Sequence, residues 1–198
     1  CDIHMGNYGR AQDTIKRLAD FDSPAIWRLK GHVALGLGHA QEAEDQLQRW
    51  VAHLRSANAW KILAIQLPRL SYALWIQGKL VEAEAIISET LQASVPSGYQ
   101  LASAHALVGF ALLSVSRGEI ERALSLFAAA AATYPIFETS KWIHDVTGRH
   151  IEAAAAALPP EVVVAARERG RALDLQATAA EVLASLESSM APTAGRQT

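Results

Sequence analysis

The side chains best suited to acid–base or metal chemistry are the seven histidines. None has the His-x-x-x-His or His-Glu-x-x-His spacing that places two imidazoles on one face of a helix, so no metal site is predicted. The densest group is His144 and Asp145 with His150, but adjacent positions of a helix face different sides. We therefore interpret His144 as a residue that interacts with the end of a helix, and we predict no catalytic residue.

Other kinds of chemistry lack their sequence signals. Lys79 follows Gly78, but the Ser or Thr and the preceding strand of a phosphate-binding loop are missing, so we expect no ATP site and no cofactor. The formal net charge of −2 predicts no direct contact with nucleic acid and no anionic-membrane surface. The single cysteine, Cys1, excludes an internal disulfide and suits the cytoplasm.

The element Gly-x-x-x-x-Ala occurs five times, each time between stretches of helical apolar periodicity. A glycine in the left-handed conformation ends one helix, and the small alanine lets the next helix pack closely against it. Five helix hairpins are therefore predicted. Their turns are expected near Gly6, Gly38, Gly78, Gly118 and Gly148.

A sequence with 51% hydrophobic residues, rich in Ala and Leu, favours an all-α fold. We predict a right-handed α-solenoid of antiparallel helix hairpins over residues 1–158. Pro68 should kink its helix or begin a new one. The predicted helices span residues 8–20, 24–37, 40–56, 58–77, 80–94, 98–117, 120–134, 136–147 and 149–158.

The pattern changes after Pro160. We predict a capping helical hairpin over residues 159–187, with its helices at 161–169 and 174–187. Gly170 is predicted to stop the first helix, and Asp174 is predicted to be the N-cap of the second. Residues 188–198 are predicted to be a flexible tail. The uncharged helix between Tyr99 and Ser116 is too short in its apolar part to span a membrane. It is either sandwiched between neighbours, which we favour, or the floor of an apolar groove.

Two sets of residues resemble known families. Trp27, Gly31, Ala43, Leu47 and Trp50 fall at the offsets of a tetratricopeptide repeat. The stretches 158–161, 165–175 and 179–183 resemble the C-terminal end of bacterial STAND-type signalling ATPases, the group that includes the maltose-regulon activator and antibiotic-regulatory proteins. In such proteins the repeat arm is joined to a LuxR-type DNA-binding domain, a nucleotide cyclase or a Ser/Thr kinase, none of which this sequence contains.

The resemblance implies that the first helix of each hairpin faces a concave surface. A cationic stripe on these helices would hold an acidic peptide end or an anionic ligand, although solvated surface charge is an alternative. Tryptophans outside the packing positions of the repeat are further candidates for this surface. The predicted concave-surface residues are Arg28, Lys30, Trp60, Lys61, Arg69, Trp75, Tyr99 and His105.

The leading hypothesis is a non-catalytic sensor and protein-interaction arm of a larger signalling or transcription-regulating ATPase. Its concave surface would take a protein, a peptide or a small effector, and the exposed ends of the repeat stack predict self-association. A freestanding adaptor protein is the alternative. An enzyme with a groove site around His105 or His144 is the third hypothesis.

Overall fold

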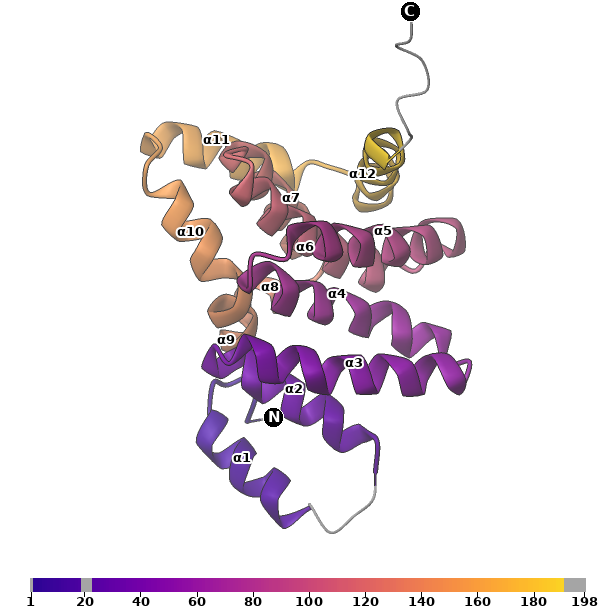
Figure 1. Cartoon of the computed structure of the whole chain (residues 1–198). Coiled ribbons are helices and arrows are strands. Elements are labelled where there is room, and N and C mark those ends of the chain that lie inside the picture. Colours follow the sequence, from indigo (N-terminus) through magenta and orange to yellow (C-terminus); the bar gives the residue numbers. More distant parts are fainter. Residues whose placement is uncertain (1, 19–22, 191–198) are drawn as a thin grey trace, which may run out of the picture.

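The computed structural model describes residues 2–18 and 23–190 (Figure 1). Cys1 and most of the predicted tail, from residue 191 onward, lie outside these ranges. In the described ranges every regular element is a helix, and consecutive helices pack as antiparallel pairs, which confirms the all-α prediction. No helix within these ranges is long and apolar enough to cross a bilayer.

The largest part of the molecule is a succession of six long helices, each packed against the one before it. A shorter helix, α1 (Tyr8–Arg17), packs against the first of them. The six are α2 (Ala25–Leu37), α3 (Ala40–Ser56), α4 (Trp60–Ile76), α5 (Leu80–Ser97), α6 (Gln100–Ser116) and α7 (Ile120–Thr133).

Five successive helices end with the same turn, at intervals of 20 residues. After each, the chain adopts a left-handed conformation, and the next N–H bonds to the carbonyl four residues before the left-handed residue, as in the 2.8 Å bond from His39 N to Ala34 O. This is a Schellman motif, which favours glycine because positive φ is strained for most residues with a Cβ. The left-handed residues are Gly38, Asn58, Gly78, Gly98 and Gly118. The turns predicted at Gly38, Gly78 and Gly118 are thus confirmed.

The other two predicted glycine turns differ from the expectation. Gly6 is left-handed, but residues 2–6 form turns rather than a helix, so it precedes α1 without closing a hairpin. The turn predicted at Gly148 is wrong, because Gly148 has a helical φ of −56°. It lies inside one continuous helical stretch, formed by α9 (Lys141–Ile143), the π-helical turn η1 (His144–Gly148) and α10 (Arg149–Ala155).

The chain reverses earlier than predicted, around Pro135 and Ser140. Tyr134 and Ser140 are extended, and between them lies the single turn α8 (Ile136–Thr139). The Ser140 side chain accepts a hydrogen bond from Ile143 N and so begins α9. The predicted helix 136–147 is therefore interrupted at Ser140.

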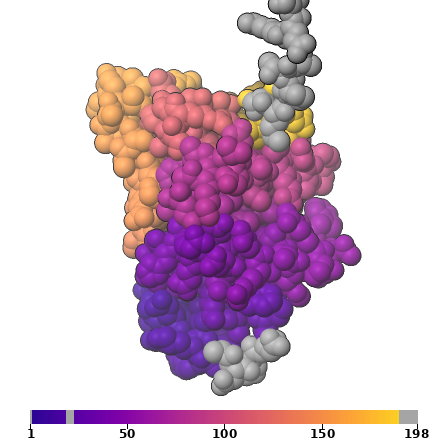
Figure 2. Space-filling model, in the orientation of Figure 1, coloured from indigo at the N-terminus to yellow at the C-terminus, as the bar shows by residue number. Residues whose placement is uncertain are grey.

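We call residues 136–155 the crossing segment, because they run across the helix pairs instead of forming another pair. Figure 1 shows α9 and α10 passing along the side of the stack that carries the ends of several long helices. The segment contacts α2, α6 and α7, and its Trp142 and Phe137 are buried. The space-filling view shows the same segment closely applied to the side of the stack (Figure 2).

The predicted capping hairpin does not form as a packed pair. Its helices, α11 (Pro160–Arg171) and α12 (Leu175–Met190), diverge in Figure 1, and α11 packs on α7 while α12 packs on α5 and α6. Gly170 lies within α11 and is not its stop; a Cβ at this position would lie 2.7 Å from the Ser125 Cα. The glycine therefore permits α11 to approach α7 closely.

The prediction for Asp174 is confirmed, and one of the two alternatives predicted for Pro68 is excluded. Asp174 is an N-cap as predicted, since its Oδ1 accepts a 2.8 Å hydrogen bond from Ala177 N at the start of α12. No new helix begins at Pro68, because α4 continues through it to Ile76. Pro68 removes one N–H from the helix, but the residues around it are buried on both sides and hold the helix together.

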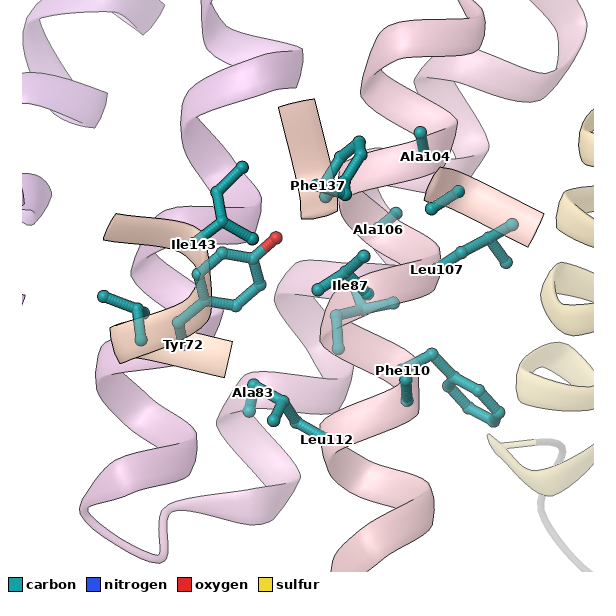
Figure 3. Close-up of a cluster of buried hydrophobic side chains, with 14 of the residues drawn as sticks. Tyr72, Ala83, Ile87, Ala104, Ala106, Leu107, Phe110, Leu112, Phe137 and Ile143 are labelled. Atoms are coloured by element: carbon teal, nitrogen blue, oxygen red, sulfur yellow. The ribbon is translucent and has the colours of Figure 1, made fainter. Parts of the chain in front are cut away.

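The core is centred on α6. Residues 102–114 of this helix are all buried between α4, α5, α7, α10 and α12, which confirms that it is sandwiched. Figure 3 shows part of this core, where Tyr72 of α4, Leu107 of α6 and Ile143 of α9 lie in one apolar cluster. The crossing segment is therefore part of the hydrophobic core.

Candidate functional site

The eight residues predicted to line a concave surface do not form one surface. Arg69 and His105 are buried, with 8% and 4% of their surface exposed. Trp60, Lys61 and Tyr99 lie together elsewhere. Arg28 lies near the buried His32 and Arg69, and Lys30 and Trp75 belong to neither group. The prediction that Arg69 and His105 line an open surface is wrong, because both side chains are buried, and Phe137 of the crossing segment packs on His105.

Arg69 and His105 belong to what we call the central polar cluster, the buried polar residues His32, Gln66, Arg69, Tyr72 and His105. Arg69 Nη2 donates to His105 Nε2 at 3.3 Å, and the Tyr72 hydroxyl donates to the His105 carbonyl at 2.9 Å. His32 Nε2 and Gln66 Oε1 are 3.2 Å apart. The cluster thus joins the middles of α2, α4 and α6.

Two aromatic rings of the crossing segment lie on this cluster. The Phe137 ring is 4.8 Å from the His105 ring, and the Trp142 ring is 5.2 Å from the His32 ring. Trp142 Nε1 also donates a 2.7 Å hydrogen bond to the His32 carbonyl. The face that the sequence marked for binding is therefore occupied by the chain itself.

Burial lowers the pKa values of the two histidines and the arginine of the central polar cluster. Desolvation, reinforced by the positive charge of Arg69, lowers the pKa of His32 and of His105 well below the usual value. Desolvation also lowers the pKa of Arg69 to about 10. The Arg69 guanidinium bonds to the Ile65 carbonyl and to His105, and its Nε has no partner in the described part of the chain. Neutral imidazoles beside a buried cation, closed off from solvent, hold helices together but offer no substrate a proton.

Trp60, Lys61 and Tyr99 form what we call the exposed patch, at the starts of α4 and α6. The Trp60 and Tyr99 rings meet edge to face at 6.2 Å, and Lys61 Nζ lies 5.7 Å from the Trp60 ring centre. Trp60 is 48% exposed, so its ring is accessible from outside, and its place on a concave binding surface stays a prediction.

The other three predicted residues lie apart. Trp75 is half-buried; its Nε1 donates to Ser116 Oγ at 2.8 Å, and its ring lies 5.0 Å from that of His150 in the crossing segment. Arg28 and Lys30 are partly exposed on α2, and Lys30 lines a hollow of about 250 Å³ beside α1 and α3. No continuous cationic stripe results.

The group around His144 holds two parts of the chain together. Within the π-helical turn, His144 Nδ1 lies 3.4 Å from Asp145, and its Nε2 lies 3.2 Å from Glu152. Tyr8 donates to Asp145 at 2.7 Å, as does Lys141. Partial burial raises the pKa of Asp145, but hydrogen bonds from Lys141, Tyr8 and His144 outweigh it and keep the pKa below its usual value. Asp145 therefore anchors α1 to the crossing segment.

Two general observations complete the description of the site. Within the described ranges no three His, Cys, Asp or Glu side chains are grouped so that they would hold a metal ion. No protein-family model, curated protein or solved structure matches the chain.

Proposed function

We propose that this chain is the non-catalytic sensor and protein-interaction arm of a larger bacterial signalling or transcription-regulating ATPase. In this proposal its helix pairs form a right-handed α-solenoid of tetratricopeptide-like repeats in the cytoplasm. The observation that carries the proposal is the recurrence of one helix stop every 20 residues from Gly38 to Gly118. Equivalent helix pairs that follow one another present extended surfaces for recognition.

The exposed patch supports an interaction role. Tyr and Trp are enriched at protein interfaces because they combine a large apolar area with a polar end. Trp60 and Tyr99 have this character, and Lys61 adds a positive charge beside them. The matching partner is a protein or peptide with an apolar anchor and an acidic residue next to it.

The face of α2 and α6 that the crossing segment covers also supports recognition rather than catalysis. The crossing segment lies against α2 and α6 through Trp142 and Phe137, so this face already accommodates a polypeptide. The burial of His105 argues against an active site at that residue. Partner binding is therefore assigned to the exposed patch.

The test uses the full-length gene product. The proposal expects a phosphate-binding loop encoded in frame with this chain, and ATP hydrolysis that responds to a partner or effector. Trp60→Ala should abolish the response and leave basal hydrolysis unchanged. Val81→Ala, which alters another strongly exposed apolar side chain, is the matched control and should respond normally.

Two results would contradict the proposal. A reading frame without a nucleotide-binding segment would favour the freestanding adaptor. A full-length ATPase that responds normally after Trp60→Ala and after removal of residues 1–190 would show that the arm senses nothing.

A further inference from the structure

A cavity of about 210 Å³ lies between α7, the crossing segment and α11, and Phe137, which packs on His105, forms part of its wall. In Figure 1 this is the region where α10 and α11 come together beside α7. Its walls come from stretches that are distant in the sequence.

One side of the cavity is apolar. The rings of Phe127 and Phe137 and the aliphatic side chains of Leu124 and Ile151 line it, and all of these except Phe127 are almost completely buried. Cavities of about 150 Å³ with such linings accept a benzene ring. A space of about 210 Å³ therefore accommodates one ring and a short polar arm.

The other side carries two cations. Arg167 and Arg171 are one helical turn apart on α11 and both line the cavity. Their guanidinium groups make no hydrogen bond or ion pair with any residue of the described ranges, whereas Arg169 between them turns to Glu121 of α7 at 2.6 Å. Arg167 is half-buried, so its guanidinium lies near the apolar wall without an ion pair to a carboxylate of the described ranges.

Acids at the rim limit the charge of a ligand. Glu152 is 3.2 Å from His144 Nε2, and Glu138 is exposed. A ligand with one negative charge pairs with the arginines, which bind carboxylates through two parallel hydrogen bonds. The two glutamates repel a second negative charge on the ligand, so they offset the stronger attraction of the arginines for a dianion.

We infer that this cavity is a binding site for a small monocarboxylate with an apolar, ring-sized body. The carboxylate faces Arg167 and Arg171, and the ring packs between Phe127 and Phe137. The inference goes beyond the proposed interaction role, since it concerns a separate site and does not require the parent ATPase. A ligand here would contact both the crossing segment and α11.

The experiment titrates the whole 198-residue chain with phenylacetate, followed by calorimetry and by the NMR methyl signals of Ile151 and Leu124. Phenylacetamide is the uncharged probe of the same shape, and phenyl phosphate is the dianion. We expect saturable binding of phenylacetate with a Kd of about 1 mM or tighter, and at least about tenfold weaker binding of the other two.

Variants on α11 assign the site. Arg167→Gln and Arg171→Gln should each weaken phenylacetate binding about tenfold. Arg169→Gln is the matched control, because its partner Glu121 lies outside the cavity, and it should bind like the unaltered chain. A thermal melt verifies that each variant folds. If Arg167→Gln does not fold, the phenylacetate affinity of Arg171→Gln alone tests the site, since Arg171 is exposed and its replacement should not disturb folding.

Three results would overturn the inference. The first is the absence of saturable phenylacetate binding, and the second is equal binding of phenylacetamide or tighter binding of phenyl phosphate. The third is a loss of phenylacetate affinity in Arg169→Gln as large as the loss in Arg171→Gln. Each of these leaves the proposed interaction role unaffected, because that role depends on Trp60 and Tyr99.

Discussion

The indole Nε1 of Trp142 donates a 2.7 Å hydrogen bond to the backbone carbonyl of His32, 110 positions earlier in the chain. Trp142 is buried, and Phe137 of the same segment packs on His105. The crossing segment therefore connects the first long helix pair to the third. Its removal would expose apolar core and the buried rings of His32 and His105 at the same time.

Truncation of Trp142 should be among the costliest single changes. Trp142→Ala is expected to lower the free energy of unfolding by about 3–5 kcal/mol, because it leaves a large cavity. Trp142→Phe, which keeps a ring but loses the hydrogen bond, should cost about 1–2 kcal/mol. Urea denaturation measures both. Trp60→Ala is the control and should cost less than about 1 kcal/mol, since Trp60 is exposed; equal losses at positions 60 and 142 would show that the segment is not part of the core.

Gly170 and Gly9 form a matched pair of helical glycines. Gly170→Ala should destabilise the protein by about 1–3 kcal/mol, because a Cβ would be 2.7 Å from the Ser125 Cα and would push α11 away from α7. Gly9→Ala should instead stabilise it by about 0.5–1 kcal/mol, since nothing lies within 4 Å of a Cβ there. Thermal melts compare the two. A gain in stability at position 170 would contradict the close packing of α11 on α7.

The regular part of the fold was predictable from the sequence because it depends on local signals. Apolar periodicity and the glycines at positions 38, 78 and 118 locate three hairpin turns, and Asp174 marks a helix start. Asn58 was missed as a turn residue. The signal was present, since Asn58 lies midway between Gly38 and Gly78, and asparagine tolerates left-handed φ better than other residues with a Cβ.

The burial of the central polar cluster was not predictable, because contacts between residues far apart in the sequence create it. The sequence marks Arg69 and His105 as residues of one concave surface, but Phe137, which packs on His105, and Trp142, which packs on His32, follow much later in the chain. Gly148 shows the same limit. It has the local pattern of a turn, yet the helix continues through it and so buries Val146 and Ile151 on either side.

Asn58 tests the 20-residue period of helix stops. Asn58→Gly should leave the stability within about 0.5 kcal/mol or raise it slightly, because glycine adopts φ of 52° without strain. Asn58→Val should cost about 1–2 kcal/mol, since a β-branched residue is strained there. Chemical denaturation measures both, with Ala57→Val as the control, as Ala57 has a φ of −85°. Equal costs at positions 57 and 58 would contradict a left-handed stop.

Stability should depend on pH through His32 and His105. Burial and the charge of Arg69 lower the pKa of both in the folded protein, whereas in the unfolded chain they titrate near the ordinary value of 6.5. As the pH falls below 6.5, the unfolded state therefore binds protons first, and stability is full above that pH and declines below it. Each histidine contributes a slope of up to about 1.4 kcal/mol per pH unit.

Urea denaturation between about pH 7.5 and 5.5 measures this dependence. His105→Gln should lower the slope by up to about 1.4 kcal/mol per pH unit, because one of the two fully buried imidazoles is gone, while the partly buried His4 and His150, whose pKa values burial also lowers, keep their smaller contributions. His39→Gln, at an exposed turn, should leave the slope unchanged. A stability that stays constant over this range, or a slope that persists in full after both buried histidines are replaced, would show that the burial of His32 and His105 does not set the pH dependence.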